Sequence, residues 1–293
     1  MRLPWLLLSF VLSWSVVAPA AGSAPARVLG SVEPITMMLR EVLGEPVHAA
    51  TLLEPGQNPH NVSFTPGQAR RAHEADLVVW TGGEAEPQVA GLLGRRKGPE
   101  LALLDQPGVY VRKGGDHHHH GHHHDRPVDP HLWLYPDNMR RLARGLEPFH
   151  EELGMEEQEL ARRVDEFVSR LEALEERLGE ELAPVADRPY LSYHDPWAYL
   201  AASLGIQRPA VVSHNLDVEP GTREFARLAR EVRDQGIECV LVEPEGRRAL
   251  LRRLCAECRV VAVDPLGRDR DGETYSSFLE GIAERFAACL GAE

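Results

Sequence analysis

The chain has 293 residues, and its 45 acidic and 32 basic side chains give a net charge of −13. This length exceeds what one compact core usually holds, so we expect two domains. The negative charge repels nucleic-acid phosphates, which argues against a nucleic-acid partner and suits a cationic ligand.

Residues 1–20 have the layout of a secretory signal peptide. Arg2 precedes an apolar run from Leu6 to Val17, and small residues follow around Ala20. The run is about 12 residues long, shorter than the roughly 20 that a membrane-spanning helix needs. No cysteine follows the candidate cleavage sites to carry a lipid. We therefore expect cleavage after Ala20 and a periplasmic, soluble monomer without a membrane anchor.

Residues 25–150 alternate short β-branched runs with amphipathic stretches. The predicted strands are Val28–Val32, Val47–Leu53 and Leu77–Thr81. A helix is predicted over Pro34–Leu43, and Thr65-Pro66 should open the next one. This order predicts a parallel sheet covered by helices, with ligand sites at the carboxyl ends of its strands.

Residues 151–184 are expected to link two lobes. From Glu156 to Leu182, apolar residues recur at three- and four-residue steps with charges between them. This spacing predicts one helix of roughly 40 Å, a rigid strut. Two helices broken near Gly179 are the alternative.

Residues 185–293 return to the α/β alternation. The predicted strands are Tyr190–Tyr193, Ala210–Ser213, Cys239–Val242 and Val260–Val263. Helices should begin near Thr222, Gly246 and Thr274. The expected fold is therefore α/β, with two lobes that are each a parallel sheet flanked by helices, joined by one long helix.

Four cysteines lie in the last quarter of the chain, at Cys239, Cys255, Cys258 and Cys289, and they allow three pairings. An oxidising compartment would permit disulfides. The Cys-x-x-Cys pair, Cys255 and Cys258, could be a local disulfide, a redox pair or half a zinc site. No second Cys-x-x-Cys completes such a site, so a structural disulfide or two free thiols are the commoner outcomes.

Three histidines share a context in which a proline lies beside them at a strand end or a helix start. They are His60 after Asn58-Pro59, His131 after Asp129-Pro130, and His194 before Asp195-Pro196. Proline restricts the backbone, so these rings should be pre-organised for a metal. Asp264 in Asp264-Pro265-Leu266-Gly267 repeats the pattern. Three neutral imidazoles leave Zn²⁺ at +2, which makes a carboxylate ligand, Asp264, the economical fourth partner.

These motifs resemble those of the cluster A-I solute-binding family, the metal-binding components of zinc and manganese ABC importers. The likeness runs from about Arg27 to the C-terminus. It rests on Asn58-Pro59-His60, residues 129–134, residues 194–200 and residues 264–267. The resemblance implies two α/β lobes joined by a backbone helix, with His60, His131, His194 and Asp264 as the metal ligands.

The metal choice follows from ligand softness within that family. Manganese binders tend to offer a carboxylate where His194 stands, and three nitrogens suit Zn²⁺ better than Mn²⁺. Some zinc members carry a glutamate just before the first histidine, where this chain has Pro59. This departure leaves either Asp264 or a water as the fourth ligand.

The resemblance also bears on two further features. A histidine tract lies between Asp116 and Asp125, where zinc members often carry such a loop, and we interpret it as a low-affinity collector or sensor. A solvated tether is the alternative. Its members are His117, His118, His119, His120, His122, His123 and His124. Zinc members also often link the positions of Cys239 and Cys289, a loop of about 50 residues that would contribute about 4 kcal/mol.

We therefore expect periplasmic Zn²⁺ capture and delivery to the membrane permease of an ABC importer, with zinc as the transported ligand and no enzymatic activity. The rivals are an importer component for Mn²⁺ or Fe²⁺, a zinc-dependent hydrolase, and a surface adhesin or zinc buffer. The chain lacks a His-Glu-x-x-His motif, which counts against the hydrolase. Metal affinity should fall as the pH drops through roughly 6.5.

Overall fold

A computed structural model describes residues 24–45, 47–113, 127–213, 219–268 and 273–291. The predicted signal peptide, residues 1–20, and the histidine tract, residues 116–125, lie outside these ranges. Within them, no helix combines the length and the apolar character that crossing a bilayer would require.

The first lobe is built on a four-stranded parallel sheet of order β2-β1-β3-β4. Its strands are β1 (Arg27–Gly30), β2 (His48–Thr51), β3 (Leu77–Trp80) and β4 (Glu100–Ala102). Its helices are α1 (Glu33–Leu43), α2 (Pro66–Glu74), α3 (Pro87–Leu93) and α4 (Pro136–Arg144). The predicted opening of α2 is a capping box, because Thr65 and Gln68 satisfy each other's backbone amides.

The second lobe repeats this plan with a parallel sheet of order β6-β5-β7-β8. Its strands are β5 (Tyr190–Ser192), β6 (Ala210–Val211), β7 (Cys239–Val242) and β8 (Arg259–Ala262). Its helices are α6 (Ala198–Leu204), α7 (Thr222–Asp234), α8 (Arg248–Leu254) and α9 (Tyr275–Leu290). Short 3₁₀ turns are η1 (Leu103–Asp105), η2 (Leu132–Leu134), η3 (Glu147–Phe149) and η4 (Ala183–Val185).

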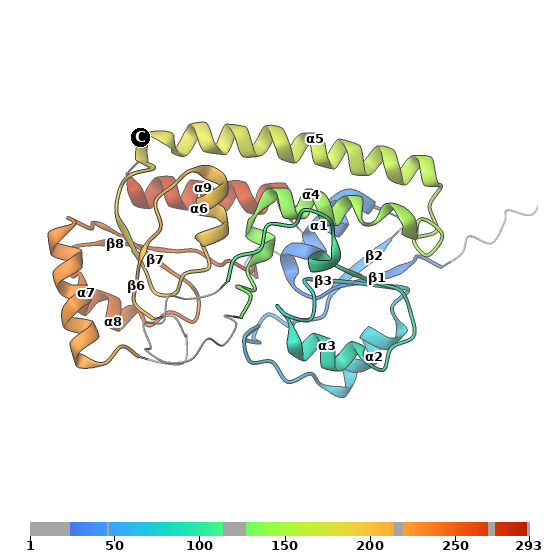
Figure 1. Cartoon of the computed structure of the whole chain (residues 1–293), viewed down its shortest axis with the longest axis horizontal. Helices are drawn as coiled ribbons and strands as arrows, with labels where there is room; N and C mark the ends of the chain where they lie inside the picture. The colour runs from blue at the N-terminus through green and yellow to red at the C-terminus, as the bar shows by residue number, and fades with distance from the viewer. Residues whose placement is uncertain (1–23, 46, 114–126, 214–218, 269–272, 292–293) are drawn as a thin grey trace, which may run out of the picture.

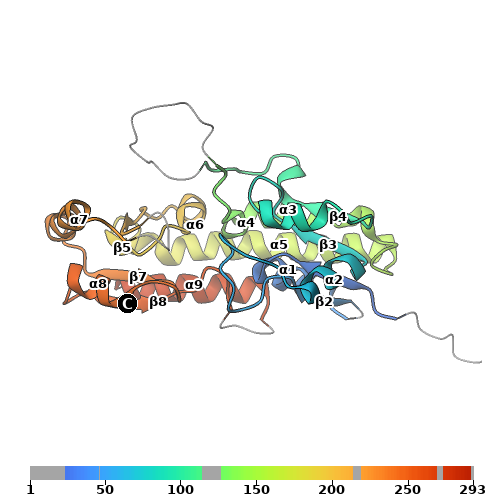
Figure 2. The same cartoon turned by 90° about the horizontal axis from the view of Figure 1, so that it is seen from below.

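One long helix, α5 (Glu157–Leu182), runs along the molecule past both sheets (Figures 1 and 2). It continues through Gly179, so the alternative of two helices is wrong. It contacts α1 and α4 of the first lobe and α6 and α9 of the second. The predicted α/β fold of two parallel-sheet lobes joined by one long helix is confirmed.

Alternate residues of each strand face different cores. In β3, Leu77 and Val79 join a core that both lobes share, whereas Val78 and Trp80 face α2 and α3. In β7, Leu241 joins the shared core and its neighbours face α7 and α8. Both faces of each sheet are therefore buried, as parallel sheets require. The shared core contains residues of α1, α4, α5, α6 and α9, so one continuous apolar interior crosses the lobe boundary.

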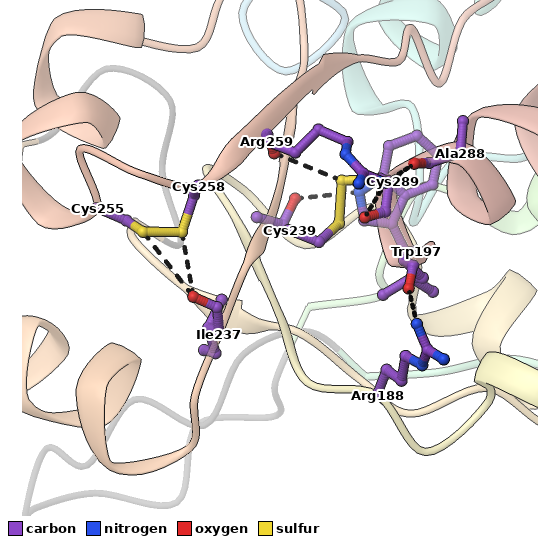
Figure 3. Close-up of a disulfide and its surroundings, with 11 residues drawn as sticks. Arg188, Trp197, Ile237, Cys239, Cys255, Cys258, Arg259, Ala288 and Cys289 are labelled. Carbon is purple, nitrogen blue, oxygen red and sulfur yellow. Dashed lines mark hydrogen bonds between the residues drawn. A yellow bond between two sulfur atoms is a disulfide. The ribbon is translucent and has the colours of Figure 1, made fainter. Parts of the chain in front are cut away.

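All four cysteines are paired (Figure 3). Cys239 of β7 and Cys289 of α9 form a disulfide with a Cα–Cα distance of 5.3 Å, which is the pairing that the resemblance implied. It ties the last helix to the second sheet. Cys255 and Cys258 form a local disulfide, so of the alternatives left open for this pair the structure has the disulfide and neither free thiols nor half a zinc site.

Candidate metal centre

The three proline-flanked histidines come from three connections of the two lobes. His60 lies in the loop between β2 and α2, in a turn where its backbone amide donates to Asn58 Oδ1 at 2.9 Å. His131 directly precedes η2, on the segment that enters α4. His194 follows β5 of the second lobe. Their location at the lobe boundary follows from the rule that loops at the carboxyl ends of parallel strands gather on one edge.

The three rings form a compact cluster, in which His60 lies in an edge arrangement with each of the other two. The ring centroid of His60 lies 5.3 Å from that of His131 and 5.4 Å from that of His194. The centroids of His131 and His194 are 5.0 Å apart. One nitrogen from each ring lies within 4.8 Å of the other two. When nitrogens bind one zinc ion with bonds of about 2.0–2.1 Å, they lie somewhat closer to one another than this limit. Small side-chain shifts would therefore be enough to bring the three nitrogens onto one ion.

A buried carboxylate orients His131. Its Nδ1 lies 2.7 Å from Asp129 Oδ1, and the backbone amide of His131 donates to the same oxygen at 3.2 Å. Burial by itself would raise the pKa of Asp129, but the hydrogen bonds and charge of His131 lower it overall. Asp129 is therefore an ionised acceptor, and Nδ1 carries the proton. This tautomer leaves the lone pair of Nε2 for a metal, as in other carboxylate–histidine pairs.

His60 is held in its neutral form. Burial of the ring in the cluster lowers its pKa to about 4, the charge of His131 acts in the same direction, and Asp129 opposes it. The residue as a whole is the exposed member of the three, whereas His131 and His194 are buried. A neutral ring with an accessible edge is the form that accepts a metal from solvent.

The segment that carries His194 rests on a buried polar chain. The indole of Trp197 donates to Ser192 Oγ at 3.1 Å, and this hydroxyl donates to Glu243 at 3.3 Å. Burial raises the pKa of Glu243 to about 8, and hydrogen bonds from Ser192 and the backbone only partly offset it. Glu243 is therefore predominantly protonated at neutral pH, and it also has a backbone hydrogen bond with His194.

Asp264 lies after β8 and is buried, but its carboxylate is engaged elsewhere. Arg268 forms a two-point ion pair with it, with nitrogen–oxygen distances of 2.9 and 3.0 Å. The backbone amides of Leu266 and Arg268 donate to the same carboxylate. Within the part of the chain that the structure describes, the cluster of meeting ligand atoms contains the three histidines and not Asp264.

Reasoning from the sequence selected the three histidines that the structure brings together and missed the residues that support them. Asp129 had a detectable signal, because it stands two residues before His131 in the quoted motif. Glu243 and Arg268 had none that we can identify. Glu243 directly follows β7 in a common Glu-Pro sequence, and Arg268 is one of many arginines.

A family model described as "Zinc-uptake complex component A periplasmic" matches residues 28–289. The high-affinity zinc uptake system protein ZnuA of Paracoccus denitrificans is 27% identical, over 94% of this chain and 94% of that protein. The protein of the same name from Yersinia pestis is 24% identical, over 98% of each chain.

Solved structures share the architecture. A crystal structure of ZnuA matches with a TM-score of 0.77, covering 91% of this chain and 100% of that one at 22% identity. At this identity the likeness shows the fold alone.

Proposed function

The chain belongs to the family of periplasmic zinc-uptake components, and from this premise we propose that it captures Zn²⁺ at His60, His131 and His194 and delivers it to an ABC importer. The observation that carries the proposal is the meeting of three imidazole nitrogens within 4.8 Å of one another. The names of its relatives, high-affinity zinc uptake system proteins, support the same function.

The donor set favours zinc over the harder divalent ions. Imidazole suits Zn²⁺, whereas Mn²⁺ is better served by carboxylates and water. The lowered pKa of His60 and the Asp129–His131 hydrogen bond present two of the rings in the form that binds metal. The metal is the cargo, so this centre needs strong binding and an eventual release.

Delivery requires a partner and a compartment. We propose export through residues 1–20, no membrane anchor, a monomeric state, and release when the protein docks on the membrane permease. The working division is a first lobe over residues 25–150, a link over residues 151–184 and a second lobe over residues 185–293. The tract over residues 116–125 is proposed to collect Zn²⁺ with low affinity near the main site, through the seven histidines named above.

A hydrolase is the rival from another class, since three histidines also hold catalytic zinc. Such an enzyme needs a general base beside the metal-bound water. Of the three carboxyl groups considered above, Asp129 is paired with His131 and Asp264 with Arg268. The third, Glu243, is buried, accepts from Ser192 and is predominantly protonated at neutral pH, so it is not a free base. This arrangement favours binding over hydrolysis. Hydrolysis of a generic ester or peptide that disappears in a His131→Ala variant would favour the enzyme.

Titration calorimetry with Zn²⁺ and Mn²⁺ tests the proposal. We expect the intact chain to bind one tight zinc equivalent and Mn²⁺ more weakly, and we expect a chain lacking residues 115–126 to retain the tight equivalent. His131→Ala should remove it, because two imidazoles remain. His73→Ala, which changes an exposed histidine of α2, is the matched control. Tight binding that survives His131→Ala but vanishes with the tract would overturn the proposal.

Transport is tested separately from binding. Expression in a bacterium that lacks its own zinc-binding component should restore growth in zinc-depleted medium if the chain serves an importer. A binding-competent protein that never restores growth with its cognate permease would point to a zinc buffer or an adhesin.

A further inference from the structure

Zinc capture by the three histidines gives no role to the contacts around Asp264. Its Oδ1 accepts from the Leu266 amide at 3.1 Å and from Arg268 Nη2 at 3.0 Å. Its Oδ2 accepts from the Arg268 amide at 2.8 Å and from Arg268 Nε at 2.9 Å. Four donors therefore occupy the acceptor sites of a carboxylate whose side chain is 3% exposed. A metal would have to displace several of them.

Arg268 is itself fixed. Its side chain is 12% exposed, and the remaining guanidinium nitrogen donates to Glu245. The planar guanidinium hydrogen-bonds to one carboxylate at two points and to a second carboxylate through another edge. These bonds leave it little freedom to rotate. The pair is buried, where charged hydrogen bonds are strong and an unpaired charge is costly.

The turn that carries Asp264 is also fixed, by groups of the other lobe. The indole of Trp133, two residues after His131, donates to the Pro265 carbonyl at 2.8 Å. Gly267 has a φ of 62°, and a Cβ placed there would lie 2.9 Å from Met37 and from Phe278. Only glycine fits this conformation and this gap. The lobe interface therefore holds the backbone of this turn in place, so only the side chain of Asp264, which Arg268 holds, is left to turn.

From these contacts we propose that Arg268 determines metal specificity by withholding Asp264 from the ion, which leaves three imidazoles and an exchangeable fourth position. This inference rests on the proposed function, because it concerns the ion bound at the three histidines. A nitrogen-only protein shell favours Zn²⁺, and an added carboxylate would make the centre more acceptable to Mn²⁺. The exchangeable position would also give a permease group or a small anion a place to enter during release.

The first arm of the test compares Asp264→Asn with the wild type. Because Asp264 is withheld, we expect zinc affinity to change by less than about threefold, well below the 10- to 100-fold loss typical when a group that supports a metal site is removed. This variant needs no change at Arg268, so it tests whether Asp264 is a ligand even if an arginine variant does not fold. A loss above tenfold would show that Asp264 is a ligand and would overturn the proposal.

The second arm frees the carboxylate with Arg268→Met, and circular dichroism checks that the variant folds. Mn²⁺ affinity should rise by about tenfold or more relative to Zn²⁺, since Asp264 can then complete the shell. The double variant Arg268→Met with Asp264→Asn should return to the wild-type ratio, because arginine acts only through the carboxylate. Arg223→Met, at an exposed arginine of α7, is the matched control and should leave the metal ratio unchanged.

The third arm tests directly whether the fourth coordination position of the metal is open to an added anion. With Co²⁺ in place of zinc, added azide should shift the visible spectrum of the wild type but not that of Arg268→Met, where Asp264 fills the position. Identical azide responses and metal ratios in the two folded proteins would overturn the inference. Failure of the proposed function looks different, because the wild type would then bind no tight metal or would keep it in His131→Ala.

Discussion

His60 shows at the scale of one residue how the site is kept ready for a metal. The folded protein lowers its pKa from 6.5 to about 4. Above pH 6.5 the ring is neutral in both folded and unfolded chains, and between pH 6.5 and 4 only the unfolded chain gains the proton. The stability of the metal-free protein should therefore fall as the pH drops through this window. Protons should likewise compete with zinc for His60 only at a lower pH than the 6.5 expected for an ordinary histidine.

We predict that His60→Gln removes this part of the pH dependence. Urea unfolding of the metal-free proteins at pH 7 and pH 4 measures it. The wild type should lose more free energy of unfolding between these values than the variant, because glutamine does not titrate. Parallel pH profiles of the two proteins would contradict the assignment.

Asp129 is predicted to set the tautomer of His131. Replacing it by asparagine keeps the shape but removes the charge that holds the proton on Nδ1. Zinc affinity should fall by about 10- to 100-fold, as is typical for the outer partner of a ligating histidine. Competition with a calibrated chelator measures the change. Asp137→Asn, at a half-buried ion pair of α4, is a control that should leave the affinity unchanged.

Glu243 gives a prediction of the opposite sign from His60. Burial raises its pKa to about 8, so between pH 4.5 and 8 the folded chain holds a proton that the unfolded chain has lost. The stability that this group contributes is complete below pH 4.5 and declines as the pH rises through the window.

The glutamine of Glu243→Gln stays neutral, so this variant should not lose stability as the pH rises through the window. At pH 8 we expect the variant to exceed the wild type by at least about 1.4 kcal/mol, the equivalent of a tenfold difference in proton affinity. At pH 4 the two should be close. Urea unfolding at both values provides the comparison, and a variant that is less stable at pH 8 would refute the neutral carboxyl group.

The three histidines that meet in the cluster could be predicted from the sequence, and the residues that hold them could not. His60, His131 and His194 each carry a neighbouring proline, which is a local signal. The pairing of Asp264 with Arg268 depends on how a turn folds back over four residues at a buried site. The sequence therefore left Asp264 as a candidate ligand beside water, and only the coordinates showed its arginine partner.

At the scale of elements, α5 is the part of the fold on which both lobes depend. Phe167 lies at its middle, fully buried, with its ring 6.4 Å from that of Tyr275 in α9. Phe167→Ala should cost about 3–5 kcal/mol, because it leaves a cavity in the shared core. Both lobes should then unfold together at a lower temperature. Glu172→Ala, on the exposed face of the same helix, is the control.

Scanning calorimetry measures this result as the number of thermal unfolding transitions. One cooperative transition, shifted down in Phe167→Ala, is the expected outcome. Two separated transitions, of which only one moves, would show that the lobes have independent cores and that the strut only connects them.

Elements with a clear period or a cap could be predicted, whereas some of the short ones could not. Thr65 and Thr274 both mark helix starts, and each forms the capping box of the helix that follows. In contrast, β4 has three residues and no β-branched side chain, and α6 is seven residues buried on nearly every side. Neither pattern has a period that the sequence alone reveals.

At the scale of the whole molecule, one apolar interior crosses the boundary between the lobes. Polar contacts reinforce it, since Glu41 of α1 accepts from the amide and the hydroxyl of Ser276 in α9. A hinge that opened widely would expose this interior to water. The two-lobe plan follows from the repeated α/β pattern of the sequence, but the shared core follows from packing between distant segments and was not predicted.

We therefore predict that zinc binding leaves the overall shape almost unchanged. Small-angle X-ray scattering of the metal-free and zinc-loaded proteins should give the same radius of gyration within error. A clear decrease on loading would indicate hinge closure of the kind seen in other two-lobed binding proteins, and the shared core would then have to break.

We propose that three imidazoles from distant parts of the chain hold one ion. X-ray absorption at the zinc edge, on a chain lacking residues 115–126 and loaded with one equivalent, tests it most directly. We expect three imidazole nitrogens at about 2.0–2.1 Å and one further, exchangeable ligand such as a water oxygen. A shell dominated by oxygen, with one imidazole or none, would contradict it.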